Sequence, residues 1–146
     1  MLRLIIIENS IFFRIGIKTA FKGNPAMYIT GEASNDAALS GLLAGTPADV
    51  VLLGVNRPDD TAYLDVTRYI RCHYPVVKIL AVANEDTARI VQSMMEAGIN
   101  GFIGKRQADR VELEKAIRRV AAGEEYIGRI DSNHCQMVKR EKEVES

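Results

Sequence analysis

Short apolar runs alternate with amphipathic segments along most of the 146-residue chain, and this alternation restricts the fold more than any other feature. Several runs are apolar nearly throughout, as expected for strands that are covered on both faces. The segments between them carry apolar residues at steps of three and four, the spacing of a helix with one buried face. The five runs span residues 2–7, 27–31, 50–54, 77–83 and 101–104.

Strand and helix therefore alternate five times, and residues suited to helix ends stand at the boundaries. We expect helix N-caps at Asn35, Asn84 and Asp109, and helix ends at Gly98 and Gly123. Such alternation predicts a parallel sheet with right-handed crossovers and helices on both faces, a three-layer α/β sandwich. The expected strand order is 2-1-3-4-5, as in the flavodoxin-like folds.

Composition and charge exclude several classes of partner. Nineteen basic and nineteen acidic side chains cancel, so no global field attracts nucleic acid or an anionic membrane. No apolar segment approaches the roughly 20 residues of a membrane span, and the N-terminal run is too short for a signal peptide. We therefore expect a soluble, cytoplasmic protein with no membrane partner. Cys72 and Cys135 lack CxxC spacing and are expected to be free thiols.

The predicted topology also indicates where a site should lie. In open α/β sheets, ligands bind beyond the carboxyl ends of the strands, at the point where the strand order reverses. For this order that point lies between the first and third strands. The residues delivered to this edge are Glu8, Asn9, residues 54–57, Ala83, Asn84 and Lys105.

These positions and their surroundings resemble the receiver domain of two-component response regulators. The resemblance is strongest to the NarL/FixJ subfamily, whose members usually join a receiver to a LuxR-type helix-turn-helix. It implies a CheY-like (βα)5 fold, with a receiver-like domain over residues 1–127 and a tail over residues 128–146. The matching stretches, in the family's order and spacing, are "LIIIENSIFFRIGIK", "GEASNDAALSGLLAGTPADVVLLGVNRP", "RYIRCHYPVVKILAVA", "MMEAGINGFIGK" and "LEKAIRRVAAGEEYI".

The resemblance also implies a set of functional positions. In working receivers, two acidic residues after the first strand and an aspartate after the third hold Mg²⁺, and that aspartate accepts the phosphoryl group. A Thr or Ser after the fourth strand and a Lys after the fifth bind the phosphoryl oxygens. In the same order, the corresponding positions of this chain are Glu8, Asn9, Gly54, Ala83 and Lys105. Only Glu8, which is still acidic, and Lys105, which is still basic, keep the residue type that the family has at these positions.

The altered positions remove the usual chemistry. Gly54 supplies no carboxylate nucleophile, so phosphoryl transfer at this position is chemically excluded. One carboxylate, one amide and the backbone carbonyl of Asn56 form a poor ligand set, so we expect Mg²⁺ binding to be weak or absent and no other metal or cofactor. Ala83 removes the switch hydroxyl, so restoring an aspartate alone should not rebuild the switch. Lys105 is expected to form an ion pair with Glu8.

Other departures from the family pattern leave alternatives open. Arg57 stands where an apolar residue is usual, and its guanidinium is interpreted as entering the vacated pocket, binding a small anion or lying in solvent. Phe102 falls on the family's switch aromatic, either as a frozen conformer or as part of the core. Tyr63 replaces a usual glycine in a loop one residue longer than the family's. His73 and His134 are expected on the surface.

Three functions are compatible with these residues. The first is a degenerate receiver, not an enzyme, that acts in signalling or transcription regulation independently of aspartyl phosphorylation, through dimerisation or partner binding. The second is a sensor that binds an anion or small ligand in the emptied pocket through Arg57 and Lys105. The third is a residual phosphoacceptor that uses Glu8 or Asp59.

The resemblance further implies partners. It predicts a homodimer, and a histidine kinase or another regulator as partner. The tail over residues 128–146 is polar and weakly patterned, consistent with a linker. Its "VKREKEV" stretch resembles the start of a LuxR-type DNA-binding domain, and a frayed helix end is the alternative. These residues contain no recognition helix, so DNA binding is expected only through an output domain outside this chain.

Overall fold

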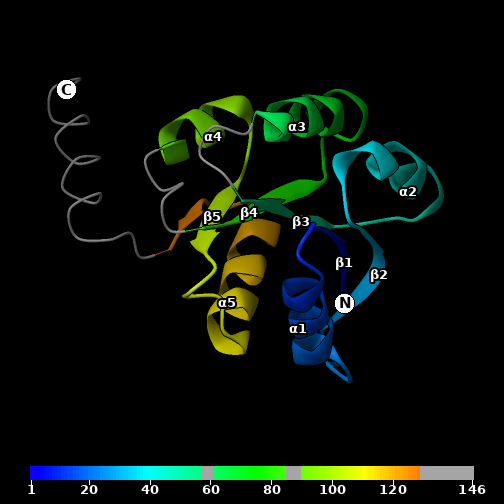
Figure 1. Ribbon diagram of the computed structural model, residues 1–146, viewed down its shortest axis with the longest axis vertical. Coiled ribbons are helices and arrows are strands. Elements are labelled where there is room, and N and C mark those ends of the chain that lie inside the picture. The colour runs from blue at the N-terminus through cyan, green and yellow to red at the C-terminus, as the bar shows by residue number, and fades with distance from the viewer. Residues whose placement is uncertain (57–60, 85–89, 129–146) are drawn as a thin grey trace, which may run out of the picture.

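A single parallel sheet organises the molecule. The computed structural model describes residues 1–56, 61–84 and 90–128 (Figure 1). The strands lie in the order β2-β1-β3-β4-β5-β6, and every neighbouring pair is parallel. The predicted order 2-1-3-4-5 is confirmed. The strands are β1 (Leu2–Ile7), β2 (Met27–Ala33), β3 (Val50–Val55), β4 (Lys78–Ala83), β5 (Gly101–Gly104) and β6 (Tyr126–Ile127).

Helices cover both faces of this sheet (Figure 1). On one face α1 and α5 share a buried cluster with Leu4 and Ile6 of β1. On the other face α2, α3 and α4 pack over Ile5 and Ile7 of the same strand. One apolar run thus supplies both cores, which confirms the predicted three-layer sandwich. The helices are α1 (Ile11–Phe21), α2 (Leu39–Gly45), α3 (Ala62–His73), α4 (Val91–Ala97) and α5 (Arg110–Ala121), with the 3₁₀ turn η1 (Asp36–Ala38) before α2.

Three of the predicted helix ends are confirmed. The Asp109 carboxylate accepts the Glu112 backbone N–H at 2.8 Å and is the N-cap of α5. Gly98 and Gly123 follow the ends of α4 and α5 with φ of 111° and 91°. These left-handed values suit glycine, which has no Cβ to strain the backbone. No helix in the described part of the chain is long and apolar enough to cross a membrane.

The predicted N-cap Asn35 is wrong for α2. Its side chain accepts the Ala37 backbone N–H inside η1, while the N-cap of α2 is Ala38, which makes no side-chain cap bond. Asn84 is followed by residues 85–89, which lie outside the described residues, so its cap stays a prediction. Its side-chain amide donates to the backbone carbonyl of Asn56.

The sheet also has a strand that the sequence did not predict. β6 pairs with β5 through Tyr126 and Ile127 and extends the sheet by one strand. It is two residues long, so it offers no apolar run to distinguish it from a loop. Because β6 lies at the far edge, the carboxyl ends of β1 and β3 still meet at the predicted reversal point.

Candidate functional site

The site begins at Glu8, directly after β1. Only 2% of the Glu8 side chain is exposed. The Ser10 backbone N–H donates to its Oε1 at 3.0 Å, and the Arg14 guanidinium donates to its carbonyl at 2.8 Å. Ser10 is also the N-cap of α1. The turn that starts the helix therefore fixes the buried carboxylate as well.

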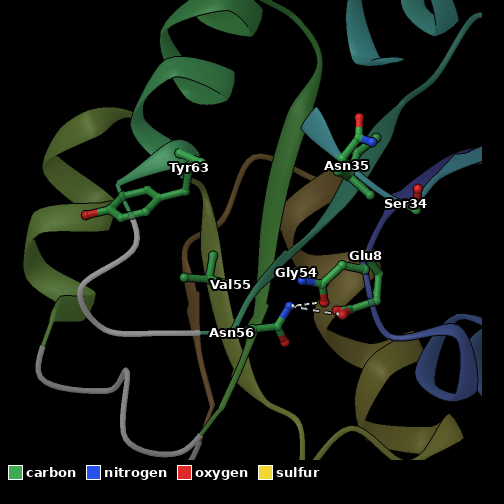
Figure 2. Close-up of a pocket in the computed structure, with 10 residues that line it drawn as sticks. Glu8, Ser34, Asn35, Gly54, Val55, Asn56 and Tyr63 are labelled. Carbon is green, nitrogen blue, oxygen red and sulfur yellow. Dashed lines mark hydrogen bonds between the residues drawn. The ribbon is translucent and has the colours of Figure 1, made fainter. Parts of the chain in front are cut away.

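Gly54 faces this carboxylate from β3 (Figure 2). It lies opposite Val82 of β4, one residue before β3 ends. A Cβ built on Gly54 would lie 2.1 Å from Oε2 of Glu8 and 2.8 Å from its Cδ. Carbon atoms in favourable contact lie about 3.5–4.0 Å apart, so both distances are severe overlaps. The Glu8 carboxylate therefore occupies the volume that any side chain at position 54 would need.

Lys105, directly after β5, completes the ion pair. Its Nζ lies 3.1 Å from Oε2 of Glu8, which confirms the predicted pairing. Nζ also donates to Oδ1 of Asn56 at 2.6 Å and lies 4.6 Å from the centre of the Phe13 ring on α1. Only 15% of the Lys105 side chain is exposed. A carboxylate, an amide oxygen and an aromatic face thus surround the ammonium, whose charge is already compensated.

Asn56 was predicted to lie at this edge, but the sequence analysis gave a role only to its backbone carbonyl and missed its side chain. Its Nδ2 donates to Oε1 of Glu8 at 3.2 Å and to Oδ1 of Asn9 at 2.6 Å (Figure 2). Its Oδ1 accepts from Lys105, so both ends of the amide are used. The signal that could have found it is an amide side chain directly after a buried strand at the predicted edge.

Ala83, the last residue of β4, and Phe102, within β5, are the remaining predicted positions near the site. Ala83 is fully buried, and its carbonyl accepts the Lys105 backbone N–H at 2.8 Å. Phe102 is 1% exposed and packs in the core cluster that α2, α3 and α4 cover. This agrees with its interpretation as part of the core. The predicted residues Glu8, Asn9, Gly54, Ala83 and Lys105 thus come from four neighbouring strand ends, as the topology requires.

A cavity of about 180 Å³ opens beside Glu8. The loop after β2 supplies Ser34 and Asn35 to its wall, and α3 supplies Tyr63 (Figure 2). Tyr63 is 7% exposed, and this burial raises the pKa of its phenol. Lys105 does not line the cavity. The described polar lining therefore consists of one carboxylate with amide and hydroxyl groups.

The oxygen donors at this site do not fit a Mg²⁺ ion. Oε2 of Glu8 faces the Lys105 ammonium, while Oε1 and the Asn9 oxygen accept from the Asn56 amide. Mg²⁺ demands near-octahedral oxygen coordination, usually with one or two carboxylates, and here it would lie against a lysine charge. Within residues 1–56, 61–84 and 90–128, no three His, Cys, Asp or Glu side chains gather as metal ligands.

Other predicted residues lie away from this cluster or outside the described ranges. Cys72 is an exposed free thiol and His73 is also exposed, both on α3, as predicted. Arg57, Asp59, His134 and Cys135 lie outside the described residues.

Comparisons with known proteins place this geometry in a family. The chain matches the response regulator receiver domain over residues 4–118. It is 26% identical over 126 residues to the transcriptional regulatory protein DegU of Brevibacillus brevis, covering 86% of this chain and 52% of that protein. It is 27% identical over 107 residues to a protein-glutamate methylesterase/protein-glutamine glutaminase of Alkalilimnicola ehrlichii, covering 73% of this chain and 27% of that protein. The chain thus spans about half the length of the first relative and about a quarter of the second.

Solved structures agree on the fold. The crystal structure of a LuxR-family two-component response regulator from Aurantimonas sp. SI85-9A1 has a TM-score of 0.79 at 22% identity, covering 97% of this chain and 98% of that one. The family match covers most of the sheet and the helices that pack on it. The parallel order of β1 to β5 is the order that the receiver resemblance predicts. The chain belongs to the response regulator receiver domain family.

Proposed function

We propose that this chain is a degenerate receiver that acts in two-component signalling or transcription regulation without aspartyl phosphorylation. The observation that carries the proposal is the Glu8 carboxylate, which fills the side-chain volume of position 54 and pairs with Lys105 at 3.1 Å. The receiver resemblance assigns the phosphoacceptor to Gly54, and phosphoryl transfer needs a carboxylate nucleophile there. A fixed internal ion pair supports a site whose arrangement does not depend on a phosphoryl group.

Glu8 itself is a poor substitute for the missing aspartate. A nucleophilic carboxylate must reach the phosphorus atom of its donor, but the Glu8 side chain is only 2% exposed. Its Oε2 is buried against Gly54 and the Lys105 ammonium. These contacts favour a structural role for Glu8 over a role as a residual phosphoacceptor. For the same reason we propose that the chain is not an enzyme.

We propose that regulation passes through surfaces, with a homodimer as the working form. Residues 1–127 would form the receiver domain and residues 128–146 a linker, with any contact to DNA made by an output domain. A group of large apolar side chains on α1 supports a contact surface, since Ile11, Phe12 and Ile15 are 55%, 85% and 52% exposed. A histidine kinase or another regulator in the cytoplasm is the other partner class that the family relationship supports.

A small-ligand sensor is the second candidate function, and the cavity beside Glu8 is the observation that favours it. Its described lining of amide, hydroxyl and carboxylate groups suits a neutral, hydrogen-bonding ligand better than an anion, because Lys105 is already paired. A ligand that binds only the folded chain raises the melting temperature. Thermal shifts against a panel of neutral metabolites and anions test this candidate, and no shift at millimolar concentration would count against it.

Titration with a phosphoryl mimic tests the first proposal. Mg²⁺ and beryllofluoride are added to ¹⁵N-labelled protein, and the backbone amides of Gly54, Asn56 and Lys105 are followed by NMR. We expect no saturable shift, because the acceptor position has no carboxylate and its volume is filled. Saturable shifts centred on these three amides would overturn the proposal, whereas shifts near Ser34 and Asn35 alone would indicate the cavity.

A further inference from the structure

The side chain and carbonyl of Asn56 contact the loops after three other strands. Its amide donates to Glu8 and Asn9 after β1, and its Oδ1 accepts from Lys105 after β5 at 2.6 Å. Its backbone carbonyl accepts the side-chain amide of Asn84 after β4. Asn56 itself follows β3. One residue therefore joins the carboxyl ends of four adjacent strands.

The Glu8–Lys105 ion pair alone does not make this connection. It joins only the loops after β1 and β5, which are separated by β3 and β4 in the sheet. The Asn56 amide lies between the two charges, donating to Oε1 of Glu8 and accepting from Nζ of Lys105. Hydrogen bonds to charged groups in a poorly solvated site are stronger than neutral ones and polarise one another. Removing the amide would therefore leave the ion pair with fewer restraints.

We propose that Asn56 is a positioning residue that locks the degenerate site from inside. Its side chain holds the loops after β1 and β5, and its carbonyl holds the loop after β4, in a single arrangement without a phosphoryl group or a metal ion. This inference rests on the proposed phosphorylation-independent function and adds a mechanism to it. The residues directly after β1, β4 and β5 are restrained together, so the surfaces of α1 and α5 are presented in one fixed state.

Replacing Asn56 by alanine tests the lock, with Asn35→Ala as matched control. Asn35 lines the same cavity, but the hydrogen bond that its side chain makes is local, to the Ala37 backbone N–H. ¹⁵N relaxation dispersion on the full chain measures exchange on the microsecond to millisecond timescale. We expect N56A to gain exchange at the amides of Ser10 and Lys105, while wild type and N35A show none, and Asn84, which bonds the backbone carbonyl that alanine keeps, to change less. Equal dispersion profiles in all three proteins would overturn the proposal.

A second substitution at position 56 distinguishes hydrogen bonding by the amide from a side chain that only fills space. Asn56→Asp keeps the acceptor for Lys105 but replaces the donor to Glu8 by a second carboxylate. Two adjacent carboxylates repel, and the single Lys105 ammonium that contacts both compensates only one charge, so one proton should return as the pH falls and restore the hydrogen bond. We expect the melting temperature of N56D to fall below wild type at pH 7 and to recover toward it as the pH falls. A deficit that does not change with pH, relative to N35D, would contradict the role of the amide.

Failure of this inference is distinguishable from failure of the proposed function. If N56A leaves the loops as rigid as wild type while beryllofluoride causes no shift, the lock is wrong and the degenerate receiver stands. If beryllofluoride binds saturably, the proposed function is wrong, whatever N56A shows.

Discussion

The Glu8 carboxylate, after β1, occupies the volume that a side chain at Gly54 of the adjacent strand β3 would need. This contact is the main feature of the site at the scale of single residues. The carboxylate that the receiver resemblance assigns to β3 is absent, and the carboxylate that follows β1 fills its place. Lys105 is then paired with a residue from a different strand than the family pattern implies. Glycine at position 54 therefore leaves room for the Glu8 carboxylate and supplies no nucleophile.

Gly54→Ala tests whether the Glu8 carboxylate holds this volume. The added Cβ overlaps Oε2 and Cδ of Glu8, so the carboxylate must leave its position. Overpacking of a buried site typically costs about 1–3 kcal/mol, and we expect a loss of unfolding free energy in this range from urea denaturation. Gly41→Ala is the control, because Gly41 is exposed in α2 and a Cβ there meets nothing within 4 Å. A G54A midpoint equal to that of wild type would show that Glu8 does not hold this volume.

Lys105→Met tests the ion pair. The substitution leaves the buried Glu8 carboxylate without its cation, and breaking a buried pair costs about 3–5 kcal/mol. We expect a loss near the lower end of that range, because 15% of the lysine side chain is exposed. Glu8→Gln removes the orphaned charge, so the E8Q/K105M double variant should recover much of the loss in urea denaturation. Strictly additive effects of the two substitutions would contradict the pairing.

At the scale of elements, the strands and helices were predictable wherever one apolar run or stripe decided the structure. Ile5 and Ile6 point into opposite cores from one continuous run, which is a strong signal for a doubly covered strand. β6 and η1 carry no comparable run, so tertiary pairing and local turn chemistry decide them. Asn84 and Asn56 show the same limit at the site, since their bonds join loops that are 28 residues apart in the sequence.

Arg3, near the start of β1, forms an ion pair with Asp49, the residue before β3. This pair predicts that the stability of the fold depends on pH. Arg3 contacts both carboxylate oxygens of Asp49 at 3.1 Å, and these hydrogen bonds hold the pKa of Asp49 below its usual value. A lowered folded-state pKa contributes stability above the unfolded pKa of about 3.9, and the contribution is lost as the pH falls through the folded value. The pair is partly exposed, so we expect a small contribution.

Asp49→Asn measures this contribution. The difference in unfolding free energy between wild type and D49N should be constant above about pH 5 and should shrink as the pH falls below the usual aspartate range. Glu124→Gln, at an exposed position after α5, is the control for general acid effects. A difference that grows at low pH would contradict the assignment.

At the scale of the whole molecule, the receiver fold is complete around a site whose position 54 carries no side chain. The sheet order is the one that the receiver resemblance predicts, and a buried cluster packs on each of its faces. α1 connects this site with the surface, since Phe13 lies against Lys105 and the neighbouring Phe12 is 85% exposed. A partner that contacts Phe12 would therefore lie next in sequence to a residue whose ring contacts Lys105.

Phe12→Asp tests the proposed dimer. Placing a charge in the apolar group on α1 should weaken self-association, because the charge would have to be desolvated in the interface. We expect wild type to be dimeric and F12D monomeric in light scattering at the same concentration. Val76→Asp is the control, since Val76 is 82% exposed but lies in the turn before β4. Monomeric wild type, or F12D that still dimerises, would contradict this surface.

The central claim is that the site works without receiving a phosphoryl group, and intact-mass measurement tests it most directly. The full chain is incubated with acetyl phosphate and Mg²⁺ and compared with an untreated sample and with Gly54→Asp. We predict no phosphoryl adduct on wild type, because Gly54 offers no nucleophile and Glu8 is buried against Lys105. We predict none on G54D, because Asn9 supplies no second carboxylate for Mg²⁺ and Ala83 supplies no hydroxyl. A stoichiometric phosphoryl adduct on wild type would contradict the account.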